Sequence, residues 1–259
     1  MTFITKPILL DERPIRCDAV PTVTQAVVMA GGKGTRLYPY SALLPKPLMP
    51  LGDMPVLELL LRQMRKAGIT DVLIAVNHLR HLIEAFFGDG RQLDLNIRYF
   101  KEEKPLGTAG ALGGMIDALD ENFIVSNGDL LTSMDLGVMA QQHCATGADA
   151  SIGVFQRENK IDFGLVEFDA DMRLSAYREK PTSLYYVSMG IYVLNREAVR
   201  HQIKPNEYLD MPSLMLALRA NDHDVRCYHD GGMWLDIGRP DDFALAQEIF
   251  ETRRELFLR

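Results

Sequence analysis

The sequence predicts a doubly wound α/β fold, in which a mostly parallel sheet is flanked by helices. Short apolar runs typical of buried strands recur through the first half of the chain, and segments with helical periodicity separate them. The connections are long enough for crossovers between parallel strands. The chain has 259 residues, which can bury a sizeable core, and α/β proteins of this length often form one domain.

The first half of the chain supplies the alternating elements. Pro55 favours the first turn of a helix, and Gly68 and Gly88 favour helix ends. Because ligands of such sheets bind at the carboxyl ends of the strands, functional motifs are expected there. The predicted strands are 25–30, 71–76, 97–100, 123–126 and 150–155, and the predicted helices are 56–64, 79–87 and 134–144.

The second half has a different pattern, because its strands are less separated by helices. Strands are predicted at 163–168, 174–178, 186–194 and 225–228, and helices at 210–220 and 241–255. We expect mixed or antiparallel strands here that share the same sheet. Residues 1–24 are interrupted by three prolines and are expected to be an N-terminal extension to a single domain at 25–250.

Composition restricts the partners and the compartment. The formal net charge is −7, from 28 basic and 35 acidic residues, which argues against a broad nucleic-acid surface. No apolar run reaches transmembrane length and no signal peptide is evident, so no membrane partner is expected. The three cysteines are far apart, which favours free thiols and a cytoplasmic location.

A glycine-rich loop follows the first predicted strand. It carries Gly31, Gly32 and Gly34, which let the backbone bend sharply and let a phosphate approach the amide N–H groups. Arg36 and Lys46 bring positive charge to the same region. An ordinary glycine turn with surface charges is the alternative interpretation of a Gly-Gly pair alone.

Two familiar phosphate motifs do not fit this loop. A Walker loop would need a glycine where Val27 stands, and Gly34 follows Lys33 where serine or threonine is required. The dinucleotide fingerprint fails because Leu37 occupies its third glycine position, which nearly excludes a nicotinamide dehydrogenase.

Two further motifs follow predicted strands. The motif 102–112 follows the strand at 97–100 and opens a helix ending near Leu119. Its small residues allow a flat ring or a phosphate to approach the backbone. The alternative interpretation is that they allow a tight contact between the helix and the sheet. Asp129 lies just past the strand at 123–126, where it suits Mg²⁺, although an Asx turn is the commoner use of Asn-Gly-Asp.

The glycine-rich loop resembles the first motif of the sugar-1-phosphate nucleotidylyltransferases, Gly-x-Gly-Thr-Arg-Leu-x-Pro followed by Pro-Lys-Pro-Leu. Residues 31–39 and 45–48 match it, and the resemblance extends over about 25–247. It implies a Rossmann-like fold with a nucleotide-binding half at 25–155 and a sugar-binding half at 156–250. It also implies transfer of a nucleotidyl group from a nucleoside triphosphate to a sugar 1-phosphate, with release of pyrophosphate.

The resemblance also implies roles for individual residues. Those expected to be catalytic are Arg36, Lys46 and Lys180, and the Mg²⁺ ligands are Asp129 and Asp236. Those expected to bind nucleotide are Ala30, Gly31, Gly32, Gly34, Thr35, Gly107, Thr108, Asn127 and Gly128. Those expected to bind sugar are Gly164, Glu179 and Ser188. Relatives usually carry asparagine at the position of Ser188, which bears on sugar preference because a hydroxyl offers fewer hydrogen bonds than an amide.

The motif 106–112 most resembles the branch that uses GTP with mannose-type or related sugar phosphates. UTP and CTP remain alternatives. A non-catalytic regulatory member of the same fold is a further alternative, although Arg36, Lys46, Asp129, Lys180 and Asp236 are all present. We leave a homo-oligomer open.

Overall fold

A seven-stranded sheet forms the centre of the protein, as seen in the computed structural model, which describes residues 23–102 and 104–258. The extension expected at 1–24 lies outside the described residues, apart from its last two. The strand order is β12-β8-β11-β6-β1-β4-β5. The strands are β1 (Gln25–Met29), β4 (Asp71–Val76), β5 (Asn96–Lys101), β6 (Asn122–Asn127), β8 (Ala150–Lys160), β11 (Thr182–Asn195) and β12 (Val225–Tyr228).

The sheet is mostly parallel, as predicted. β6, β1, β4 and β5 run parallel to one another, and β12 runs parallel to β8. β11 is antiparallel to both of its neighbours, β6 and β8. The carboxyl ends of β1 and β6 therefore lie at the same edge of the sheet, where the glycine-rich loop and the Asn-Gly-Asp turn begin.

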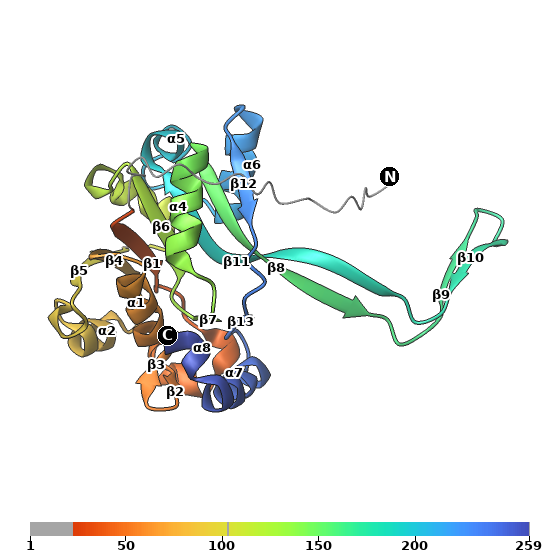
Figure 1. Cartoon of the computed structure of the whole chain (residues 1–259), viewed down its shortest axis with the longest axis horizontal. Coiled ribbons are helices and arrows are strands. Elements are labelled where there is room, and N and C mark those ends of the chain that lie inside the picture. Colours follow the sequence, from red (N-terminus) through yellow and green to blue (C-terminus); the bar gives the residue numbers. More distant parts are fainter. Residues whose placement is uncertain (1–22, 103, 259) are drawn as a thin grey trace.

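Helices cover both faces of the sheet, which makes the fold doubly wound (Figure 1). Side chains of β1 alternate between two core clusters, with Ala26 and Val28 in one and Val27 in the other. The first cluster is packed by α1 (Val56–Lys66), α2 (Arg80–Phe87) and α4 (Leu136–Thr146). The second is packed by α3 (Gly107–Gly110), α5 (Arg196–Arg200) and α6 (Met211–Ala220).

The helix expected to end near Leu119 is broken into short pieces. α3 is followed by the 3₁₀ turns η5 (Ala111–Gly114) and η6 (Ile116–Ala118). The segment holds four glycines, which lower helix propensity, and a Cβ at Gly114 would collide with the ring of Phe100. The tight packing against the sheet therefore overrides a regular helix.

A third core cluster lies beyond the carboxyl edge of the sheet. It packs the segment after the glycine-rich loop against α7 (Pro240–Arg253) and α8 (Glu255–Leu258). The elements of this region are η1 (Thr35–Leu37), η2 (Tyr40–Ala42), η3 (Lys46–Leu48), β2 (Pro50–Leu51), β3 (Met54–Pro55), β7 (Leu130–Thr132) and β13 (Trp234–Asp236). The pairing of β7 with β13 brings the segment around residue 236 next to the segment after Asp129.

A long β-ribbon projects from the body of the protein (Figure 1). β8 and β11 stay paired as far as Lys160 and Thr182, and the hairpin of β9 (Leu165–Phe168) and β10 (Leu174–Arg178) lies at the far end. We call residues 156–187 the arm. The prediction that all strands of the second half share one sheet is wrong for β9 and β10, because they pair only with each other.

No described helix is long and apolar enough to cross a membrane. The cysteines of the described residues, Cys144 and Cys227, are free.

Candidate nucleotide site

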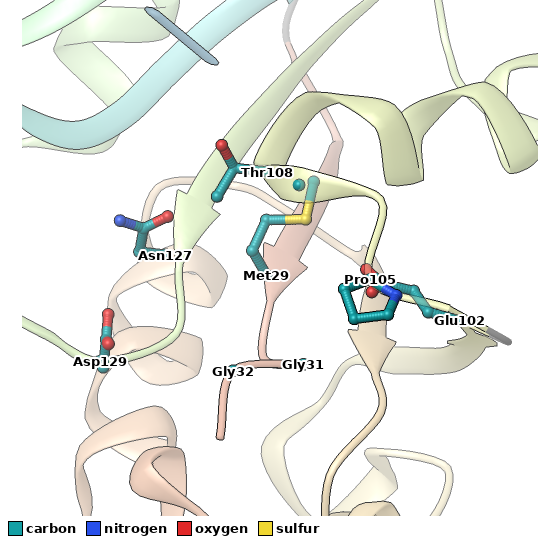
Figure 2. A pocket seen from close by; sticks show the side chains of 9 residues that line it. Met29, Gly31, Gly32, Glu102, Pro105, Thr108, Asn127 and Asp129 are labelled. Atoms are coloured by element: carbon teal, nitrogen blue, oxygen red, sulfur yellow. The ribbon is translucent and has the colours of Figure 1, made fainter. Parts of the chain in front are cut away.

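A pocket of about 300 Å³ opens at the carboxyl ends of β1, β5 and β6 (Figure 2). Ligands of doubly wound sheets bind at the carboxyl ends of the strands, at the point where the strand order reverses. The lining residues are Met29, Gly31, Gly32, Glu102, Pro105, Gly107, Thr108, Asn127 and Asp129. Six of these nine are residues that the sequence predicted to bind nucleotide or metal, and they come together from segments far apart in the chain.

The glycine-rich loop forms one wall of the pocket. Ala30 follows the last residue of β1, and its N–H donates to the carbonyl of Ala75 at 2.9 Å. A Cβ at Gly31 would lie 3.3 Å from Cβ of Asn77, whereas one at Gly32 would meet nothing within 4 Å. Gly34 has a φ of 61°, a conformation that side chains rarely adopt. The loop therefore leaves its backbone open at Gly32 and turns at Gly34 into the 3₁₀ turn η1.

Thr35 and Arg36 lie on η1, and both are exposed. Within the described part of the chain, no carboxylate forms an ion pair with Arg36. Its guanidinium is thus available to an anion.

Lys46 joins two acidic residues at the rim of the pocket. Its ammonium forms an ion pair with Asp129 and lies 3.7 Å from Oδ1 of Asp236. η3 carries Lys46, the turn after β6 carries Asp129, and β13 carries Asp236. The two acidic segments are tied together, because the N–H of Ile237 donates to the carbonyl of Asp129 at 3.2 Å.

Burial makes the Asp129 carboxylate costly to ionise. Desolvation raises the pKa of Asp129, and the neighbouring ammonium of Lys46 opposes that shift. The charge of Asp236 raises the pKa of Asp129 further. The pair of carboxylates is therefore a place where a positive charge is stabilised.

The two carboxylates fit a divalent cation. Both approach one ammonium, so they converge on a single cation-sized position. Among the described residues no group of three or more His, Cys, Asp or Glu could hold a metal, so the protein would supply two carboxylates. Mg²⁺ commonly takes one or two carboxylates together with phosphate oxygens of a substrate.

Backbone contacts fix the opposite wall. The carbonyl of Leu209 accepts hydrogen bonds from Ala109 and Gly110, both at 2.9 Å. Gly107 has a φ of 77°, and a Cβ there would lie 2.5 Å from the Leu209 carbonyl oxygen. The Thr108 hydroxyl accepts from the N–H of Met211 at 3.0 Å, so it supports the start of α6 as well as lining the pocket.

Glu102 is a pocket residue that the sequence interpretation did not select. Burial raises the pKa of its carboxyl group, while the Leu106 backbone N–H that it accepts lowers it. Its Oε2 would lie 3.5 Å from a Cβ at Gly31, so the carboxylate faces the glycine-rich loop. The signal was present in the sequence, because Glu102 lies two residues past the predicted strand at 97–100, much as Asp129 lies three residues past the one at 123–126.

The floor near β6 is equally crowded. The N–H of Gly128 donates to the carbonyl of Met29 at 2.9 Å, which closes the turn after β6 onto β1. A Cβ at Gly190, whose φ is 74°, would lie 2.5 Å from Nδ2 of Asn127. Glycine at position 190 therefore lets the bulged part of β11 approach Asn127.

The proposed sugar residues are not gathered at this pocket. Gly164, Glu179 and Lys180 lie on the arm, which holds them away from the body (Figure 1). On the arm, the hydroxyl of Tyr177 donates to Glu179 at 3.3 Å. Ser188 lies at the base of the arm, and its hydroxyl is bonded to that of Tyr192 at 2.9 Å.

Comparison with known proteins gives one family. Residues 25–253 match the family described as "Nucleotidyl transferase". Mannose-1-phosphate guanylyltransferase of Mycobacterium tuberculosis is 35% identical over 85% of this chain and 62% of its own length. The mannose-1-phosphate guanyltransferase of Schizosaccharomyces pombe is 31% identical over 87% of this chain and 64% of its own length. UTP–glucose-1-phosphate uridylyltransferase of Synechocystis is 30% identical over 86% of this chain and 62% of its own length. The chain thus spans less than two thirds of these relatives.

Solved structures agree on the fold. HddC from Yersinia pseudotuberculosis, complexed with GMP-PN, superposes with a TM-score of 0.68 over 88% of this chain and 100% of that chain, at 22% identity. At that identity the likeness is one of architecture.

Proposed function

Because this chain belongs to the nucleotidyl transferase family, we propose that it transfers a nucleotidyl group from a nucleoside triphosphate, GTP by preference, to a sugar 1-phosphate. An oxygen of the sugar phosphate attacks the α-phosphorus. The bond from that phosphorus to the oxygen bridging the β-phosphate breaks, and its electron pair leaves with pyrophosphate. The products are an NDP-sugar and pyrophosphate.

The observation that carries this proposal is the meeting of Lys46, Asp129 and Asp236 beside the open backbone of Gly32. Nucleotidyl transfer needs positioning and charge neutralisation more than a protein nucleophile. The pocket offers both, because a cationic side chain and a carboxylate pair stand at the rim of a cavity lined by glycine backbone.

Each group has a separate task. The backbone from Ala30 to Thr35 holds the triphosphate, and Arg36 stabilises the charge that develops on the leaving pyrophosphate. Lys46 lies where it can neutralise phosphate oxygens. Asp129 and Asp236 would hold a divalent cation, which we propose to be Mg²⁺ and which would offset charge at the reacting phosphorus.

Glu102 supports guanine as the base. A carboxylate on a pocket wall accepts hydrogen bonds, and guanine presents two neighbouring donors on its Watson–Crick edge, where uracil presents one. Glu102 is half-buried, so a base that offers it fewer donors leaves part of its hydrogen-bonding capacity unused and is disfavoured. Gly107, Thr108, Asn127 and Gly128 shape the rest of that pocket.

For the sugar phosphate we propose Lys180, Glu179 and Gly164 on the arm and Ser188 at its base. Support for these residues comes from the motif resemblance. In the structure the arm keeps Lys180, Glu179 and Gly164 outside the pocket of the same protomer. We also propose a cytoplasmic location, which the triphosphate substrate and the free thiols of Cys144 and Cys227 support.

A matrix of GTP, UTP, CTP, dTTP and ATP against mannose 1-phosphate and glucose 1-phosphate, with pyrophosphate detected, tests the proposal. We expect pyrophosphate release with GTP and a mannose-type phosphate, and almost none from Asp129→Asn. Preference for a pyrimidine triphosphate would overturn the choice of base. Binding of GTP without pyrophosphate release from any pair would indicate a non-catalytic member.

A further inference from the structure

The hairpin at the end of the arm has one apolar face that is largely exposed. Cross-strand pairing places Val166 opposite Tyr177 and Phe168 opposite Leu174. Side chains two apart on a strand share a face, so these four form one patch. Their exposed fractions are 47%, 60%, 56% and 65%, respectively. We call them the hairpin patch.

An irregularity in β10 builds this patch. The register shifts between Leu174 and Ala176, so Ser175 is an extra residue. Without the bulge, residues 174 and 177 would point to opposite faces, because their spacing is odd. The bulge therefore gathers apolar side chains on one side, which is not how a hairpin that faces water on both sides is built.

The other face of the hairpin carries charges that neutralise one another, beside Leu165 and Ala176. Glu167, on that face, forms an ion pair with Arg178. In the turn, Asp171 pairs with Arg173 at 3.7 Å, and Asp169 accepts N–H groups at 2.9 Å. Across the whole arm there are five basic and six acidic residues. A strongly charged partner such as nucleic acid therefore finds no complement here.

The hairpin cannot use its own body to cover the patch. Five consecutive residue pairs, from Gln156 with Tyr186 to Lys160 with Thr182, extend the ribbon away from the body, which Tyr186 still touches through His229. At about 3.4 Å per residue they keep the hairpin roughly 17 Å further out. Figure 1 shows the hairpin at the tip of this ribbon, away from the described body.

The exposed area of the patch suits a weak dimer. The hairpin patch holds four of the nine exposed large hydrophobic side chains that the arm carries among the described residues. At their exposed fractions these four leave roughly 450 Å² accessible, so two patches packed together would bury roughly 900 Å², near the lower end for a specific interface. A two-stranded hairpin alone is also marginally stable in water, so it gains from a second layer.

We propose that the hairpin patch docks on the same patch of a second copy of this chain. Two patches packed face to face form an isologous interface, a small sandwich of two two-stranded sheets. The internal neutralisation of the hairpin charges lets two identical surfaces meet without repulsion.

Sedimentation velocity over a wide range of protein concentrations tests this with the full chain. The wild type should form a dimer that dissociates on dilution. Leu174→Glu should raise the dissociation constant by at least about 100-fold, because each substitution acts twice in a symmetric interface. The matched control is Ser175→Glu, which adds the same charge to the adjacent exposed residue and should leave the dimer intact.

Hydrogen exchange of the amides of β9 and β10 gives a second readout that does not depend on a variant. Their protection should rise with protein concentration, because the dimer stabilises a hairpin that is weak alone. A wild type that is monomeric throughout would overturn the proposal, as would equal effects of the two substitutions. Protection that is independent of concentration and lost when residues 1–22 are removed would assign the patch to that segment instead.

Discussion

At the scale of single residues, the ammonium of Lys46 lies beside two carboxylates that a divalent cation would also bind. Its ammonium is paired with Asp129 and near Asp236, so it balances their charge without metal. A cation at the same position would displace the ammonium, which would then be free to meet a phosphate oxygen. Metal binding and the release of Lys46 would then be coupled.

Removing this ammonium should therefore strengthen metal binding while weakening catalysis. Lys46→Met should bind Mn²⁺ or Mg²⁺ about fivefold more tightly or better, because an ion pair of partly exposed groups is worth on the order of 1 kcal/mol. Calorimetric titration of the metal measures this, and turnover should fall in the same variant. Lys66→Met, at an exposed position on α1, is the control and should change neither. Unchanged metal affinity in Lys46→Met would rule out the competition.

Glu102 is expected to select the base. Glu102→Gln keeps the size but removes the charge and one acceptor, so the kcat/KM ratio of GTP over UTP should fall by about 10- to 100-fold. The measurement is pyrophosphate release with each triphosphate in turn. Glu251→Gln, an exposed carboxylate on α7, should leave the ratio unchanged. Equal losses with both triphosphates would mean that Glu102 supports the pocket without reading the base.

At the scale of elements, a buried histidine joins α4 to the sheet. Nδ1 of His143 lies 2.9 Å from the hydroxyl of Ser151 on β8, and Nε2 lies 3.3 Å from Oδ1 of Asn122 on β6. Burial lowers the pKa of His143 from 6.5 to about 4. The ring is thus neutral in the folded protein at pH values where the unfolded chain is protonated.

This histidine should make the protein sensitive to acid. Between pH 6.5 and 4 the unfolded state binds a proton that the native state does not, so the free energy of unfolding falls as the pH falls, by on the order of 3 kcal/mol. Urea unfolding at several pH values measures the slope. His143→Gln should flatten it, although the variant loses some stability at neutral pH. The same slope in His143→Gln and in the exposed-site control His81→Gln would place the acid sensitivity elsewhere.

At the scale of the whole molecule, the arm is separate from the core. None of the three core clusters of the described residues includes a residue from 156 to 187. The stability of the body therefore rests on the sheet and its helices. The arm instead carries the hairpin patch and the three residues proposed to meet the sugar phosphate.

Shortening the arm should separate these roles. Replacing residues 161–181 by Asn-Gly joins Lys160 to Thr182, which already pair, through a turn that suits a two-residue hairpin. We expect the thermal midpoint and GTP binding to change little, while dimerisation and use of the sugar phosphate are lost. Calorimetry, GTP titration, sedimentation and pyrophosphate release measure the four properties. A large drop in the thermal midpoint would show that the arm stabilises the body.

Much of the body could be predicted from local pattern. The strand at 71–76 has the bounds predicted, and those at 25–30, 97–100 and 123–126 differ by a residue or so, because buried strands show as apolar runs between glycines and polar turns. Lys46, Asp129 and Asp236 could be selected from motifs, and the structure does bring them together. The broken helix after Gly107 could not be predicted, because Leu209, which crowds Gly107 and Gly110, is distant in sequence, and because only the fold brings the ring of Phe100 against Gly114.

The sequence by itself determined the doubly wound class, the family and the glycine-rich loop, because these depend on periodicity and on short motifs that a chain carries locally. Only the tertiary structure decided where the second half goes. Residues 156–160 are all polar and gave no strand signal, yet they pair with β11 and carry β9 and β10 out of the main sheet. Strand pairing joins residues across the chain, so its extent depends on the partner strand as much as on the segment itself. That pairing separates Lys180 from the pocket of its own protomer and exposes the hairpin patch.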